Sequence, residues 1–261
     1  YGMGVRSYLL GRPPVTNMYE TVVWVPWGAI IFAALLEWKS RSRTVLMVSA
    51  LLSVFCLILT DLAPSVLDKS LSPLQPVLRD NFWLTTHVLV ITLSYAAFFL
   101  AFALADLQLF YFLRDENKFA QKIQEGTKAI YRSIQVGVIL LGAGIILGGI
   151  WADYSWGRFW GWDPKENGAL LICLWLLVAI HGRLAGKMKA LGYALAMCFT
   201  NIIVALAWFG VNLLNVGLHS YGFTENIAYN LAAFCILQMV VIIGAWVTIL
   251  FRESKNGVKT A

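Results

Sequence analysis

The sequence predicts an all-α protein, a polytopic bundle of about seven membrane-spanning helices. The 261 residues are 59% hydrophobic and only 13% charged, a composition that indicates a membrane protein and excludes an ordinary soluble domain. Apolar runs of span length alternate with short polar or basic segments. All four cysteines lie inside apolar runs and form no C-x-x-C pair, which argues against a disulfide framework or a redox motif. We therefore treat residues 1–261 as a single membrane domain.

The apolar runs define the expected spans. The lead-in, residues 1–17, contains adjacent prolines in G-R-P-P-V-T-N that prevent a continuous helix. Pro26 lies in the first span and should kink it, which membrane helices tolerate. The third run exceeds the roughly 20 residues of an untilted span, so it should project beyond the hydrocarbon. The predicted spans are residues 18–38, 44–60, 82–113, 133–150, 169–182, 190–214 and 227–251.

The connections between these spans differ sharply in charge. One set is rich in Lys and Arg and includes a soluble-looking connector, residues 114–132, and the polar tail; the opposite set holds only Lys69, Arg79, Arg158 and Lys165. Positive loops mark the cytoplasmic side, so the lead-in and the loop at 151–168 should face outward. The net charge of +6 thus indicates topology rather than nucleic-acid binding. A start on the outside without a signal peptide leads us to expect a further span upstream.

The segment between the fourth and fifth spans, residues 151–168, reads W-A-D-Y-S-W-G-R-F-W-G-W-D-P-K-E-N-G and holds four of the 11 tryptophans. Such a loop should lie at the membrane–water interface, and its rings could form an ordinary aromatic belt. A belt needs no fixed spacing, whereas W-G-x-x-W-x-W-D compresses three indoles and a carboxylate into eight positions. We favour a platform for a planar apolar ligand. A second, shorter pattern at residues 65–74 suggests a short interfacial helix.

The chain has only three histidines, each in or beside an apolar run. A lone histidine there is usually a packing residue. His87 and His219 both fall on the outer side, however, at the level of the Trp-rich loop, and two neutral imidazoles beside an aromatic platform suit axial ligation of haem iron. Zinc with Asp163 as a third ligand stays open. His181 lies about 18 Å further inward and would belong to a second site completed by another chain or segment.

Four separated motifs resemble one family. W-G-R-F-W-G-W-D-P-K-E (residues 156–166) resembles the "WWD" signature of the haem-handling proteins of cytochrome c biogenesis. H-G-R (181–183), V-N-L-L-N-V-G-L-H-S-Y-G-F (211–223) and G-R-P-P-V-T-N-M-Y-E (11–20) are similar to the CcsA (ResC) branch of the system II cytochrome c synthase. The resemblance covers essentially the whole chain. The chain departs from the family pattern at Asn167-Gly168, where many relatives have Thr-Trp. This departure leaves the shape of the platform less well defined where the loop enters the fifth span than at residues 156–163.

The resemblance implies a haem-handling subunit that presents haem b at the outer face of a bacterial cytoplasmic or thylakoid-type membrane. With a CcsB (ResB)-type partner it would act as a cytochrome c haem lyase on CXXCH motifs of apocytochrome c, and it would export haem; thioredoxin-like thiol-reducing proteins are further expected partners. By motif position, His87 and His219 match the external axial ligands and His181 a transmembrane ligand. The cofactor-binding residues carried over from the WWD core are Trp156, Gly157, Trp160, Trp162 and Asp163.

No acid–base pair or nucleophilic triad is expected of this chain, because the reactive groups belong to haem and acceptor. Three rival interpretations remain. A CcmC-like exporter or chaperone loader would carry haem without ligating it. A bis-His cytochrome b would usually place its ligands on spanning helices at matched depths. An assembly scaffold with aromatic belts would use neither His87 nor His219.

Overall fold

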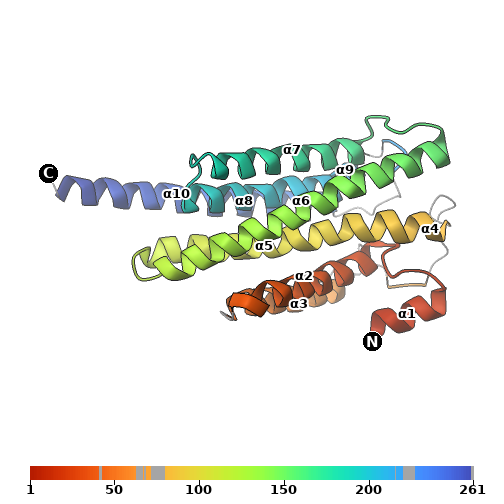
Figure 1. The fold of residues 1–261 in the computed structure, drawn as a ribbon, viewed down its shortest axis with the longest axis horizontal. Coiled ribbons are helices and arrows are strands. Elements are labelled where there is room, and N and C mark those ends of the chain that lie inside the picture. The colour runs from red at the N-terminus through yellow and green to blue at the C-terminus, as the bar shows by residue number, and fades with distance from the viewer. Residues whose placement is uncertain are drawn as a thin grey trace.

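The computed structural model describes residues 1–40, 43–62, 67, 69–71, 80–214, 216–219 and 227–259, and these described residues form helices and connections without a strand. The long helices run alongside one another in a bundle, and the C-terminal end of α10 extends past the others (Figure 1). The α-helices are α1 Gly2–Leu10, α2 Met18–Ser40, α3 Thr44–Leu62, α4 Asn81–Trp83, α5 Leu89–Asp115, α6 Ala120–Trp156, α7 Pro164–Leu184, α8 Ala190–Ala205, α9 Val211–Leu213 and α10 Ile227–Lys259.

The predicted all-α membrane bundle is confirmed. Within the described residues, seven helices are long and apolar enough to cross a membrane. Two short π-helical turns interrupt the pattern: η2, Leu84–Val88, leads into α5, and η3, Leu206–Gly210, follows α8. π-turns are rare and often occur at functional sites, and both of these turns lie near the end of the bundle where α6 passes to α7 (Figure 1).

The helices around the Trp-rich segment are longer than the sequence predicted. Helix α5 ends at Asp115 and α6 begins at Ala120, so most of the expected connector 114–132 is helical. Helix α6 continues through Trp156 and ends at Gly157, whose φ of 70° is the left-handed conformation that stops a helix. The non-helical loop is therefore residues 157–163. No proline interrupts 120–156, and the polar residues at its start extend the same helix.

The N-terminal lead-in contains α1, which the sequence did not predict; it ends at Gly11, with φ 62°, before the proline pair. Most of the pattern at 65–74 and the motif positions 220–223 lie outside the described residues. At one end of the bundle lie the α5–α6 and α7–α8 turns and the C-terminal end of α10, and at the other lies the α6–α7 loop (Figure 1). The basic connections predicted to share one side thus share one end.

Helix α5 forms the centre of the bundle and packs along α6, α2 and α8. Its Phe98 is fully buried and lies against Gly137 of α6: a Cβ added to Gly137 would fall 2.3 Å from Phe98 Cε1. The glycine is needed because the two helices approach so closely there. Gly142, one turn further along α6, would meet nothing within 4 Å.

We expect Gly137→Val to destabilise the bundle by about 1–3 kcal/mol, because the added methyl groups overlap a buried ring that cannot move freely. The measurement is the thermal unfolding midpoint in detergent, with Gly142→Val as the matched control on the same helix. Equal midpoints for the two variants would contradict the close approach of α5 and α6.

Candidate functional site

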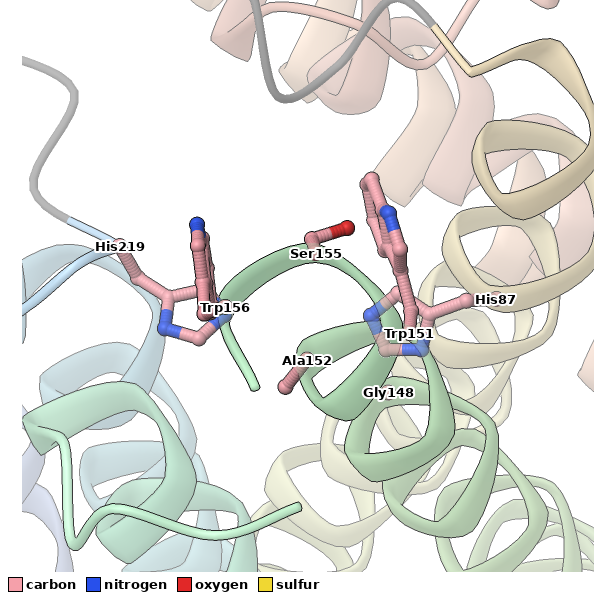
Figure 2. A pocket seen from close by; sticks show the side chains of 7 residues that line it. All are labelled: His87, Gly148, Trp151, Ala152, Ser155, Trp156 and His219. Carbon is pink, nitrogen blue, oxygen red and sulfur yellow. The ribbon is translucent and has the colours of Figure 1, made fainter. Parts of the chain in front are cut away.

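A pocket opens beside the end of α6, where the last turns of that helix lie between the two outer histidines. It encloses about 270 Å³, including its open mouth. Figure 2 shows His87 and His219 on opposite sides of this pocket, with Ala152 and Ser155 between them. The lining residues are His87, Gly148, Trp151, Ala152, Ser155, Trp156 and His219. The structure thus brings together two of the three histidines and one tryptophan of the predicted site.

His87 belongs to the π-turn η2, and its ring lies against α6 where Gly148 has no side chain. Its Nδ1 lies 2.9 Å from the carbonyl oxygen of Gly144, and a carbonyl can only accept, so Nδ1 carries the proton and Nε2 keeps its lone pair. Gly148 makes room, because a Cβ there would lie 2.6 Å from His87 Cε1. The ring meets Trp151 edge-on, at 5.6 Å between centroids. His87 is therefore held in a metal-binding tautomer.

His219 is held in the same tautomer by a carboxylate. Its Nδ1 lies 3.2 Å from Asp163 Oδ1, and its ring meets Trp156 perpendicularly at 5.2 Å. Burial lowers the pKa of His219, the Asp163 carboxylate raises it, and the burial effect prevails. His219 is consequently neutral at physiological pH with its Nε2 available. Carboxylate–histidine pairs of this kind orient metal ligands in many proteins.

Asp163 connects the Trp-rich loop to the His219 segment. It is the N-cap of α7: Oδ1 accepts from the backbone N–H of Lys165 at 2.9 Å. Its Oδ2 accepts from the backbone N–H groups of Leu218, at 2.7 Å, and His219, at 3.4 Å. Burial alone would raise the pKa of Asp163, but the Lys165 N–H, the His219 ring and the other N–H donors together lower it. It is thus an ionised, loop-fixing carboxylate.

Glu166 organises the loop between α6 and α7. Its carboxylate accepts from Arg158 Nη1 at 2.9 Å, from the Gly161 N–H at 2.8 Å and from the Asp163 N–H at 3.1 Å. With Asp163 it forms a capping box at the start of α7. Arg158 in turn lies over the Trp156 ring, 5.6 Å from its centroid. Glu166 therefore holds both the loop and the cation beside a pocket tryptophan.

We expect Glu166→Ala to make the loop open more readily, because three charge-assisted hydrogen bonds are lost at once, each contributing about 1.5–3 kcal/mol. Trypsin cleavage after Arg158 should accelerate by at least about tenfold, since a local opening cost that falls by 1.4 kcal/mol gives that factor. The control is Glu125→Ala on α6, whose carboxylate bonds only to Gln121 in the exposed part of that helix. Unchanged cleavage at Arg158 would contradict this role of Glu166.

A second link joins the start of α7 to η3. Lys165 Nζ donates to the Trp208 carbonyl at 2.7 Å. A π-turn displaces carbonyls from the regular helical ladder, which leaves that oxygen available. Gly168 is closely packed against the same turn: an added Cβ would lie 2.8 Å from Ala207 Cβ and 3.1 Å from Ala207 Cα. In this backbone position 168 has room only for glycine.

The remaining Trp-rich positions lie away from the pocket. Trp160 and Trp162 meet perpendicularly at 5.9 Å, and Trp162 is 69% exposed with a positive φ of 56°. Asn167 donates to the Trp162 carbonyl at 2.9 Å, which stabilises that strained turn. Gly157 ends α6 and also does not line the pocket. Trp160 and Trp162 therefore form an aromatic pair that does not line the pocket, and the Trp162 side chain is exposed.

His181 lies near the opposite end of α7, eighteen residues after Asp163 and thus about 27 Å away along the helix axis. Its side chain is exposed, and its Nδ1 lies 2.7 Å from the Leu177 carbonyl of its own helix. The carbonyl again requires the proton on Nδ1, so Nε2 keeps its lone pair and can act as a ligand. The structure does not bring His181 to the other histidines.

The pocket residues fit a bis-histidine haem better than zinc. Two imidazoles with lone pairs on Nε2 face a space with indole walls, and each imidazole carries the outer-shell acceptor expected of a metal ligand. Among the described residues no three His, Cys, Asp or Glu side chains lie together as a metal site. Asp163 uses its oxygens on Lys165, Leu218 and His219 instead. A zinc site with Asp163 as third ligand finds no support here.

Sequence reasoning missed part of the pocket wall. Gly144, Gly148, Trp151 and Ser155 follow one another at intervals of four, three and four residues, which is one face of a helix. That spacing is visible in the sequence, but only if α6 is extended past residue 150. Because the segment from Trp151 was assigned to a loop, its helical periodicity was not considered.

Comparison with known proteins identifies the family of this chain. The family model described as "Cytochrome C assembly protein" matches residues 15–219. The chain is 32% identical to the cytochrome c biogenesis protein CcsA of Parasynechococcus marenigrum, with 84% of this chain and 80% of that protein covered. It is 32% identical to CcsA of Chlorella vulgaris, covering 82% and 78%, and 34% identical to CcsA of Chlamydomonas reinhardtii, covering 85% and 67%. The chain is therefore an integral membrane protein that belongs to the cytochrome c assembly protein family, a family that implies haem handling and a role in cytochrome c maturation.

Proposed function

We propose that this chain holds haem b at the outer membrane face and, with a CcsB (ResB)-type partner, promotes its covalent attachment to the CXXCH motif of apocytochrome c. The observation that carries the proposal is the pair of His87 and His219. They come from distant parts of the chain, line one pocket, and each has its Nδ1 held by an acceptor. Packing histidines need no such shared orientation, whereas axial ligands do.

The haem is here a substrate, and its own chemistry supplies the reaction. Each acceptor thiol adds across a haem vinyl group, so that a C–S bond forms and the thiol hydrogen passes to the neighbouring carbon without an external oxidant. The protein contributes position. His87 and His219 hold the iron, and Trp151 and Trp156 bound the macrocycle. The histidine of CXXCH then replaces one of the two ligands and lets the product leave.

The pocket is open to the surface, and its 270 Å³ includes the space at that opening. A planar macrocycle held between the two histidines would therefore extend out through the opening. An edge that protrudes is what an acceptor protein needs to reach the vinyl groups. Complete burial would favour a permanently bound electron-transfer haem instead.

The orientation follows from charge. Lys and Arg lie in or beside the α5–α6 turn (Arg114, Lys118, Lys122), in or beside the α7–α8 turn (Arg183, Lys187, Lys189) and at the end of α10 (Arg252, Lys255, Lys259), and these segments share the end opposite the α6–α7 loop (Figure 1). Positive connections face the cytoplasm, which puts the pocket outside, in a bacterial cytoplasmic or thylakoid-type membrane. His181 then lies near the cytoplasmic side with Nε2 exposed, where a ligand from the partner completes a transmembrane haem site. Thioredoxin-like proteins would keep the CXXCH thiols reduced.

The test is co-expression of the chain with its CcsB-type partner and an apocytochrome c that carries one CXXCH motif. Covalent haem on the acceptor, detected by haem staining after denaturing electrophoresis, is the expected result, and it should disappear when the chain is omitted. A haem exporter or chaperone loader would leave the acceptor with haem that denaturation removes. That outcome would replace the lyase proposal with the loader one.

A further inference from the structure

A carboxylate lies inside the membrane-spanning part of the bundle, remote from the histidine pocket. Asp106 belongs to α5, where that helix meets α8 and α10. Cys198 Sγ of α8 donates to Asp106 Oδ1 at 3.2 Å, and Gln238 Nε2 of α10 lies 3.5 Å from Asp106 Oδ2. Counted along the chain from His87, Asp106 is about 28 Å away at 1.5 Å per residue. The pocket and its proposed function do not use it.

Within the described part of the chain, Asp106 has no ion-pair partner, whether Lys, Arg or His, that could balance an ionised carboxylate. Its two side-chain partners, a thiol and an amide, are neutral. Carboxylates in membrane spans are costly to ionise and normally pair with a cation or mark a functional site. An ionised Asp106 would therefore carry a negative charge that neither of its two side-chain partners could stabilise.

Glu20 shows what a balanced buried carboxylate looks like in the same protein. It is 2% exposed, and Arg6 Nε donates to its Oε1 at 2.6 Å. Its Oε2 accepts from the Thr16 N–H at 2.7 Å and from the Thr16 hydroxyl at 2.5 Å. Every partner is a donor and one is a full cation, so Glu20 is a carboxylate. Asp106 has only the weaker thiol and a long amide contact.

We infer that Asp106 is a neutral carboxylic acid, an intramembrane proton-binding site that joins α8 and α10 to α5. The amide of Gln238 can present either Nε2 or Oε1 to Asp106. With Oε1 turned toward Asp106, a proton on Oδ2 donates to Oε1, and the Cys198 thiol donates to Oδ1, which is the carbonyl oxygen of the acid.

The site has a structural consequence for α10. That helix has the least buried of the seven candidate spans, at 11% of its apolar window. With so little packing, a directional hydrogen bond from the acid helps to fix the rotation of α10, together with the bonds from Arg252 to the Phe112 and Leu113 carbonyls at 3.1 and 2.6 Å. Loss of the proton would remove the hydrogen bond from the acid. Ionisation of Asp106 would therefore weaken the attachment of α10 without unfolding the bundle.

The test is infrared difference spectroscopy of the purified full chain with its partner, comparing wild type with Asp106→Asn. We expect the wild type to show a protonated-acid carbonyl band that Asp106→Asn lacks, with no change in the carboxylate bands. Glu20→Gln is the matched control and should instead lose carboxylate bands. Loss of carboxylate bands in Asp106→Asn would overturn the inference and indicate a cation supplied by the partner chain.

A second variant covers the case in which Asp106→Asn fails to fold. Cys198→Ala removes the thiol that donates to Oδ1, so the carbonyl band of the acid should move to higher frequency while its intensity stays. A band that does not move, or a shift confined to the carboxylate region, would also overturn the inference. Neither readout depends on haem binding, so this inference can fail while the proposed function holds, and the reverse.

Discussion

The purified chain with its partner is expected to show a reduced low-spin haem b spectrum that weakens in both His87→Ala and His219→Ala. Haem affinity should fall by more than about 100-fold in each variant, because losing an outer-shell partner alone costs about 10–100-fold and these variants remove the ligand itself. Added imidazole should restore the low-spin bands, since each deletion leaves space beside the iron. Absorption titration with haem measures both effects.

The matched control is Tyr154→Ala. Tyr154 lies in the same last turns of α6 but is 76% exposed and does not line the pocket. Its replacement should leave the spectrum and the affinity unchanged. If both histidine variants behave like Tyr154→Ala, the two rings are packing residues, and the edge-on contacts with Trp151 and Trp156 would account for their position.

The sequence predicted the spans well, because apolar length decides them directly. The first expected span, 18–38, coincides with the observed one. The errors occur where polar residues continue a helix beyond the hydrocarbon, as at Ala120 and Trp156. Hydropathy reports where lipid ends, whereas a helix ends only where its backbone is capped, and here Gly157 and Asp163 provide the caps.

The role of the predicted site residues stays a prediction, but the structure shows which of them lie together. The predicted topology puts His87 and His219 at a similar depth in the membrane, and in the structure both line one pocket. What their sequence neighbourhoods could not reveal is the hydrogen bonding to Gly144 and Asp163, because those partners are 57 and 56 positions away in the chain. The choice among Trp residues also required the helix: Trp151 and Trp156 line the pocket from α6, while Trp160 and Trp162 follow the end of that helix and do not line the pocket.

Asp163→Asn is expected to lower haem affinity by about 10–100-fold, the usual cost of changing a group that positions a ligating histidine. An asparagine can still accept from the Lys165 N–H and cap α7, since Asn and Asp are comparable N-caps. Its amide NH2, however, would face the N–H groups of Leu218 and His219, and donors do not pair with donors. His219 then loses its orientation, while the His87 side of the pocket keeps its contacts.

The measurement is again absorption titration, combined with the thermal midpoint in detergent. A large loss of affinity with a nearly unchanged midpoint, reversed by imidazole, would separate the orienting role of Asp163 from its capping role. The matched control is Asp153→Asn, an exposed carboxylate on α6, which should change neither quantity. If Asp163→Asn binds haem as the wild type does, the carboxylate serves only the helix, and His219 is positioned by the Leu218 turn and by Trp156.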